Sequence, residues 1–136
     1  MAGYSGTPLV RKLGIKPPMS VLILHAPTGY TRTLGPLPGG VEVATALKVP
    51  LDFIHFFTLR RGDLESRFGA LVRALAPAGM LWISWPKKAA KVETDLTEDV
   101  VRALGLRAGL VDVKVCAVDE VWSGLKFVRR LADRKS

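Results

Sequence analysis

The chain has 136 residues, of which 49% are hydrophobic and 24% are charged, so a disordered chain is excluded and one folded domain is expected. Its one cysteine and two histidines are too few for a disulfide framework or a Cys/His zinc site, so no metal site is predicted. The formal net charge of +8 favours nucleic acid, phosphorylated ligands or acidic partners, without choosing among them.

The first residues and the apolar runs bear on where the protein works. Residues 1–4 lack the basic segment and the long apolar stretch of a signal peptide, and the lone Cys116 suits a reducing compartment. We therefore expect a cytoplasmic protein. Apolar runs such as 80–83 are too short to cross a bilayer, so no membrane partner is expected. The expected organisation is a single domain over residues 1–136, with a helical lead-in (1–18) and a basic tail (132–136).

Six stretches of the chain predict strands. Most of them are nearly continuous in apolar residues, which is typical of strands that are covered on both faces of a sheet. In chain order the predicted strands cover residues 21–24, 41–45, 51–58, 80–85, 110–118 and 125–131.

Helices are expected before and between these strands. The first follows Thr7, a predicted N-cap, and ends at Gly14, and a short second helix ends near Leu34. The third is expected over residues 63–75, because its apolar side chains recur on one helical face behind an N-cap at Asp63. The fourth begins near Asp95, whose carboxylate would form a capping box with Glu98, and ends at Gly105 or Gly109.

The fifth strand has a pattern of its own. Its residues alternate between apolar and charged, which indicates a half-exposed strand at the edge of the sheet. The expected faces are Val111, Val113, Val115 and Ala117 on one side, and Asp112 and Lys114 on the other. Because helices separate most strands, the fold class is α/β, with a three-layer, mostly parallel sheet of about six strands and a C-terminal antiparallel hairpin.

The order of elements, with the strand APAGMLWIS in its middle (residues 76–84), resembles the later half of class I S-adenosylmethionine-dependent methyltransferases. The resemblance covers residues 16–131 and implies a Rossmann-like sheet. It also implies that the second strand of the last hairpin inserts antiparallel into the sheet and leaves the first strand at the edge.

A second resemblance is to an uncharacterised bacterial family, a domain of unknown function. It covers nearly the whole chain and implies no known activity. The stretches that carry it are GYSGTPL (3–9), SWPKK (84–88), TDLTE (94–98), VKVCAVD (113–119) and WSGLKF (122–127).

Three absences argue against a working methyl-donor site. The turn after the first strand (25–29) keeps one glycine, and Pro27 removes a backbone donor. No acid follows the second strand in residues 43–46, where the methyltransferase fold holds the ribose, and the chain is short by about one strand–helix unit. We therefore expect a non-catalytic domain with no catalytic residues and no cofactor, S-adenosylmethionine being disfavoured.

Ligands of open parallel sheets bind beyond the carboxyl ends of the strands. This rule selects four loops, at residues 25–30, 58–62, 84–91 and 119–124. Their aromatic, basic, acidic and small polar residues are expected to converge on one face. The candidate ligand-binding residues are His25, Thr28, Gly29, Trp85, Lys87, Lys88, Asp119, Trp122 and Ser123.

Each candidate also has a structural interpretation. Trp85 and Trp122 either close the top of the core or stack on a ligand, and His25 is either a titrating group or a hydrogen-bonded structural residue. The second histidine, His55, and the cysteine, Cys116, lie inside predicted strands and are expected in the core.

The main functional hypothesis is that these loops bind an anionic small molecule or a protein partner. The alternative is an S-adenosylmethionine-dependent methyltransferase with an altered cofactor site. A second alternative is an accessory nucleic-acid-binding protein, because residues 126–136 hold five basic residues and one acid.

Overall fold

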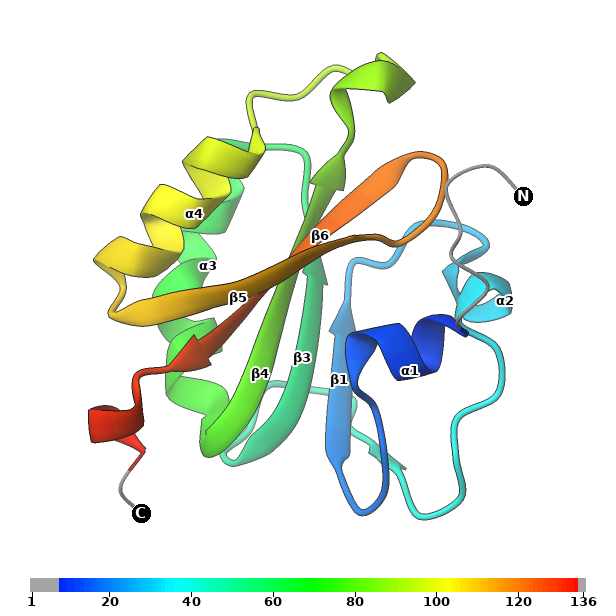
Figure 1. Cartoon of the computed structure of the whole chain (residues 1–136), viewed down its shortest axis with the longest axis vertical. Coiled ribbons are helices and arrows are strands. Elements are labelled where there is room, and N and C mark those ends of the chain that lie inside the picture. Colours follow the sequence, from blue (N-terminus) through cyan, green and yellow to red (C-terminus); the bar gives the residue numbers. More distant parts are fainter. Residues whose placement is uncertain (1–7, 135–136) are drawn as a thin grey trace.

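The computed structural model describes residues 8–134. Thr7, the expected first N-cap, and part of the basic tail lie outside these residues. The described chain forms a twisted sheet with helices on both faces, which confirms the three-layer α/β prediction (Figure 1). The strands are β1 (Ser20–Leu24), β2 (Glu42–Val43), β3 (Leu51–Phe57), β4 (Leu75–Pro86), β5 (Leu110–Ala117) and β6 (Trp122–Arg129).

The strand order is β2-β1-β3-β4-β6-β5. The first four strands are parallel, and β6 is antiparallel to both β4 and β5. The second strand of the final hairpin therefore inserts next to β4 and leaves β5 at the edge, as the resemblance implied. Leaving β1, the chain adds β2 on one side and then returns to place β3 on the other, so the direction of the strand order reverses at β1 and β3.

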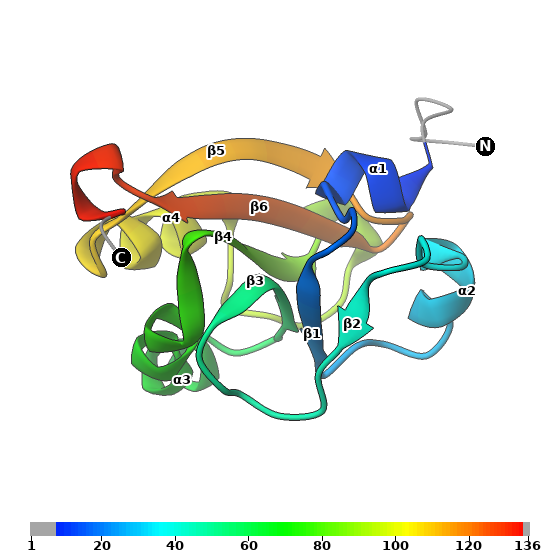
Figure 2. The same cartoon turned by 90° about the horizontal axis from the view of Figure 1, so that it is seen from below.

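Helices of very different length cover the two faces. The long helices α3 and α4 pack on one face, and the short helices α1 and α2 pack on the other (Figure 2). Their bounds are α1 (Leu9–Leu13), α2 (Tyr30–Leu34), α3 (Arg61–Ala74) and α4 (Glu98–Arg107). In the described part of the chain, no helix has the length and apolarity to span a bilayer.

The helix starts differ from the sequence prediction. The helix α4 begins after Thr97, whose hydroxyl accepts a hydrogen bond from the backbone N–H of Val100 at 3.2 Å. Asp95 lies two residues earlier, and its carboxylate accepts from the N–H of Arg61 at 2.7 Å. Asp95 therefore provides a hydrogen-bond acceptor for the first backbone N–H of α3 rather than for the N–H groups of α4. Sequence spacing favoured the local cap, but the loop after β4 brings Asp95 across to the neighbouring helix.

Asp63 is also not an N-cap. It lies in the first turn of α3, which starts after Arg60. Its carboxylate accepts a hydrogen bond from the hydroxyl of Thr58 at 3.1 Å, so it ties the helix to the end of β3.

The predicted alternation of the edge strand is broken by a bulge. The register of β5 against β6 shifts between Asp112 and Lys114, so that Val113 is an extra residue. Beyond the bulge the faces exchange: Val115 lies opposite Leu125, whereas Lys114 lies opposite Lys126. The prediction that the valines share one buried face is therefore wrong. Val113 and Val115 are 51% and 42% exposed.

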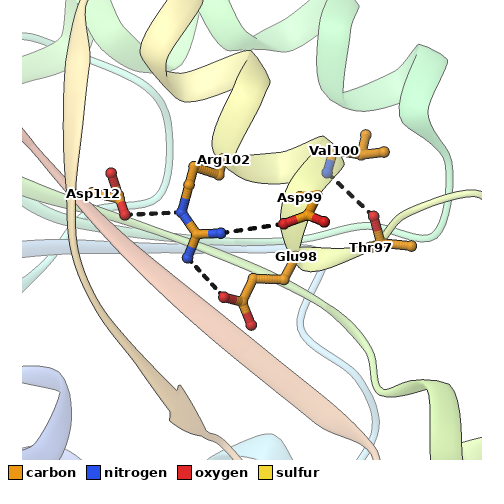
Figure 3. A network of polar contacts seen from close by, with 6 residues as sticks. All are labelled: Thr97, Glu98, Asp99, Val100, Arg102 and Asp112. Atoms are coloured by element: carbon orange, nitrogen blue, oxygen red, sulfur yellow. Dashed lines mark hydrogen bonds and ion pairs between the residues drawn. The ribbon is translucent and has the colours of Figure 1, made fainter.

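One arginine joins α4 to this edge strand. Arg102 donates to Glu98 at 2.7 Å within the helix and to Asp112 of β5 at 2.9 Å, and Asp99 lies 3.5 Å away (Figure 3). These hydrogen bonds raise the pKa of Arg102, and Arg102 in turn lowers the pKa of Asp112. The network fixes α4 over the antiparallel end of the sheet.

Candidate functional site

A cavity of about 400 Å³ lies where the strand order reverses, beyond the carboxyl ends of β1 and β3. This is the place where open α/β sheets bind ligands, because the connections leave the sheet in opposite directions there. We refer to it as the switch-point cavity. It is lined by His25, Phe57, Thr58, Leu59, Arg60, Asp63 and Trp122.

The aromatic walls of this cavity come from strand ends. His25 follows the last residue of β1 and has a left-handed backbone (φ 58°), which turns the chain sharply out of the sheet. Its ring contacts Phe56, with 5.1 Å between the ring centres. Trp122 opens β6 and packs edge-to-face on Phe57 at 5.3 Å, so its indole is held in place while remaining half-buried.

The polar wall comes from the start of α3. Asp63 is half-buried, accepts a hydrogen bond from Thr58 and lies 3.7 Å from the guanidinium of Arg67. Arg60 is exposed beside it. The cavity therefore offers one carboxylate as a hydrogen-bond acceptor, one guanidinium and the face of an indole. Sequence reasoning used Asp63 as a cap and missed it as a site residue.

Two of the candidates, Thr28 and Gly29, lie in the turn before α2. The helix has five residues, and the N–H of Tyr30 donates to the carbonyl of Pro27 at 3.1 Å. Thr28 and Gly29 are exposed and line neither of the cavities described here. Gly29 has φ 92°, and a Cβ added there would meet no atom within 4 Å, so the backbone is open to solvent.

A second cavity, of about 480 Å³, lies on the face of the sheet that α3 and α4 cover, and we refer to it as the lysine cavity. It is formed by the end of β4, the loop that follows and the start of α4. Among its lining residues are four of the sequence candidates: Trp85, Lys87, Lys88 and Ser123.

The two candidate tryptophans do not share a face. Trp85 pairs with Ser123 across the β4–β6 ladder, and Trp122 is the next position on β6. Neighbouring residues of a strand point to opposite faces, so Trp122 lies on the other side of the sheet from Trp85. Trp85 is 4% exposed and belongs to the core under α3 and α4. The expectation of one converging face is therefore wrong. Two candidates, His25 and Trp122, line the switch-point cavity, and four line the lysine cavity.

The carboxylate of Asp119 is used by the hairpin turn. It accepts hydrogen bonds from the backbone N–H groups of Val121 and Trp122, both at 2.8 Å. This fixes the turn that carries Trp122 and accounts for Asp119 structurally.

A buried polar network lies below the switch-point cavity. The hydroxyls of Tyr30 and Ser84 contact the two ring nitrogens of His55 at 2.8 Å and 2.7 Å. His55 and Ser84 are fully buried, as the strand prediction for His55 expected. Burial lowers the pKa of His55 to about 3 and raises the pKa of Tyr30 above its ordinary value. The imidazole is therefore neutral, and each of its nitrogens has a partner.

This network was missed in the sequence. The available signal was one histidine inside an apolar strand, which requires hydrogen-bonding partners when it is buried. None of the three side chains lines either of the cavities described here, and all three are buried in the core. In residues 8–134 no group of three or more His, Cys, Asp or Glu side chains is arranged to hold a metal ion.

No protein-family model matches the chain, and no curated protein matches it. Solved structures do resemble it. A SAM-dependent methyltransferase from Aquifex aeolicus has a TM-score of 0.60 and 18% identity over 88% of this chain and 86% of its own. A Burkholderia thailandensis 1,6-didemethyltoxoflavin-N1-methyltransferase, with S-adenosylhomocysteine bound, has a TM-score of 0.60 and 16% identity. The match covers 89% of this chain and 74% of the methyltransferase. A DhpI–SAH complex has a TM-score of 0.58 and 14% identity over 82% of this chain and 77% of its own.

These neighbours establish the methyltransferase-like fold that the order of elements suggested. They also correct two sequence-based expectations, that the domain is non-catalytic and that it has no cofactor. Two of the three neighbours described above hold the demethylated methyl donor in their structures. The three absences in the sequence therefore do not exclude a methyl donor.

Proposed function

We propose that the chain is an S-adenosylmethionine-dependent methyltransferase with an altered cofactor site, and that the donor occupies the switch-point cavity. The observation that carries the proposal is the position of this cavity, at the reversal of strand order in a sheet with methyltransferase topology. Its lining of indole, imidazole, carboxylate and guanidinium suits a ligand that is part aromatic and part zwitterionic.

The residues fit the donor in part. Residues 44–47, which follow β2, contain no acid to hold the ribose hydroxyls. Asp63 is the acid in the cavity lining, and it enters from α3 rather than from β2. In the proposal it replaces the missing carboxylate as the acceptor for the ribose hydroxyls. Arg60 is placed to pair with the carboxylate of the methionyl part.

The indole of Trp122 has two uses in this arrangement. Its π face attracts a cation and stacks on a planar base, and the donor contains both a sulfonium and an adenine. The contact with Phe57 and the two N–H bonds to Asp119 hold Trp122 in one position. When bound, the donor supplies an electrophilic methyl group. His25, which also lines the cavity, is the proposed base for the substrate that accepts the methyl group.

The test is calorimetric titration of the full chain with S-adenosylmethionine and S-adenosylhomocysteine. We expect saturable binding of both. Asp63→Asn, which keeps the shape and one acceptor oxygen, should weaken binding at least about tenfold. Trp122→Leu should weaken it similarly. The control is Asp99→Asn, because this side chain is 97% exposed on α4, and it should leave affinity unchanged.

Absence of binding at millimolar donor by the folded wild-type chain contradicts the proposal. Equal affinity of the wild type and Asp63→Asn would contradict the role given to this carboxylate. A thermal unfolding scan of each variant shows that the fold is intact.

A further inference from the structure

A groove of about 730 Å³ lies on the thinly covered face of the sheet, next to α1. Met19, which precedes β1, is part of it, whereas the switch-point cavity lies past the other end of β1. The two sites are therefore separate, and the inference below does not depend on the proposed function. The groove is lined by Pro8, Val10, Arg11, Gly14, Ile15, Lys16, Met19, Leu34, Gly35, Pro36, Pro38, Met80 and Lys126.

The floor of this groove is aliphatic. Ile15, Leu34 and Met80 are buried, so the apolar atoms are recessed rather than raised from the surface. Gly14 lets the helix α1 approach the sheet closely: its φ is 88°, and a Cβ added there would lie 3.3 Å from the Met80 sulfur. Among residues 8–134 the lining includes no aromatic side chain, so this part of the chain provides no platform on which nucleic acid bases could stack.

The rim of the groove is basic. Arg11, in the middle of α1, and Lys16, three residues after its end, are exposed, and Lys126 is half-buried on β6. Among residues 8–134, the ion pairs involve Arg61, Arg67 and Arg102, and none reaches Arg11, Lys16 or Lys126. The positive charge at the groove is therefore uncompensated by the described part of the chain.

Two lysines face one another beside the groove. Lys114 and Lys126 are directly opposite on β5 and β6, where like charges destabilise a sheet. Burial, and then the charge of Lys114, lower the pKa of Lys126. An anion bound at Lys126 would offset this repulsion.

We propose that this groove binds a free amphiphilic carboxylate, with its aliphatic chain on the apolar floor and its head at Lys126 and Arg11. The volume is within the range of small-molecule sites, which are apolar with a few charged groups that fix orientation. A head group at Lys126 exchanges a like-charge contact for an ion pair. The aliphatic chain covers Val10 and Met19, apolar lining residues that are only half-buried.

The test compares three probes by calorimetry on the full chain at low salt: decanoate below its micelle concentration, decanol, and inorganic phosphate. We expect saturable binding of decanoate, and binding at least about tenfold weaker of decanol and of phosphate. Weak decanol binding shows that the head matters, and weak phosphate binding shows that the chain matters. Equal affinity for decanoate and phosphate would overturn the proposal, because the floor would then contribute nothing.

Two variants locate the site. Lys126→Met keeps the aliphatic stem and removes the charge, so decanoate binding should fall at least about fivefold while decanol binding does not fall. Arg107→Met is the matched control, because Arg107 is an exposed cation at the end of α4 on the other face, and it should change nothing. An equal loss in both variants would show a general effect of net charge and overturn the proposal.

Further binding measurements test whether the groove takes another kind of ligand. Failure of decanoate together with binding of a short oligonucleotide, or of anionic phospholipid vesicles, would replace the proposal with a macromolecular one. Binding of S-adenosylhomocysteine is measured in the same samples. If decanoate binds and S-adenosylhomocysteine does not, the groove stands and the proposed function fails.

Discussion

The two faces of this sheet are built in opposite ways. One face is covered by helices of 14 and 10 residues whose side chains pair with neighbouring elements, and the other is covered by two helices of five residues each. The ion pairs of residues 8–134 belong to the first face, and the basic groove belongs to the second. The long helices pack closely on the sheet, whereas the thinly covered face keeps an open groove.

The largest effect is expected from a change in the packing between α4 and the sheet. A Cβ on Gly105 of α4 would overlap the ring of Phe127, which is fully buried on β6. We expect Gly105→Ala to lower the free energy of unfolding by about 3 kcal/mol, because a close-packed core has no room for the methyl group. Urea denaturation monitored by circular dichroism measures it.

The control for this change is on the other long helix. Gly69→Ala in α3 places its methyl near the flexible end of Arg73, at 3.2 Å, on an exposed surface. It should be neutral or stabilise by up to about 1 kcal/mol through helix propensity. Equal stability of the two variants would show that α4 is not packed as closely on β6 as described.

The next effect belongs to the other face, where His55 is held neutral. Its pKa of about 3 in the folded chain lies below the ordinary value of 6.5, so the unfolded chain binds more protons between these values. Stability is thus complete above the ordinary pKa and falls as pH falls below it. Between about pH 7.5 and about pH 5 the wild type should lose about 2 kcal/mol.

His55→Gln tests this sign. The variant keeps polar atoms for Tyr30 and Ser84 but does not titrate, so its stability should change much less over the same pH interval. Denaturant titrations at both pH values give the comparison. A parallel loss in the variant and the wild type would assign the acid sensitivity to other groups.

The smallest effect is expected from the ion pairs on the face that α3 and α4 cover. Arg102 is 28% exposed, and its network joins α4 to β5. Because partly exposed ion pairs are weak, Arg102→Met should lower the free energy of unfolding by less than about 1 kcal/mol, and high salt should reduce the difference. Arg107→Met serves as the control. A loss of several kcal/mol that is independent of salt would mean that Arg102 acts by packing.

The fold could be predicted from the sequence because its signals are local or follow general rules. Continuous apolar runs identified the inner strands, Gly14 identified the end of α1 with its left-handed backbone, and the family resemblance gave the insertion of β6. The errors involve contacts between distant segments. Asp95 bonds to Arg61, 34 residues away, and a capping pattern cannot show this.

The site was predicted less well, for two physical reasons. The bulge at Val113 shifts a strand by one residue, and the alternation of Val and Lys carries no sign of it. The expected site also merged two faces, because Trp85 and Trp122 were placed by loop rather than by their register on β4 and β6. Register decides the face, and it is set by pairing across the sheet.

The most direct test of donor binding is a crystal structure of the full chain with S-adenosylhomocysteine. We expect the ligand in the switch-point cavity, between His25 and Trp122, with its ribose hydroxyls on the carboxylate of Asp63. Ligand density in the lysine cavity or the basic groove, with the switch-point cavity filled by solvent alone, would contradict it.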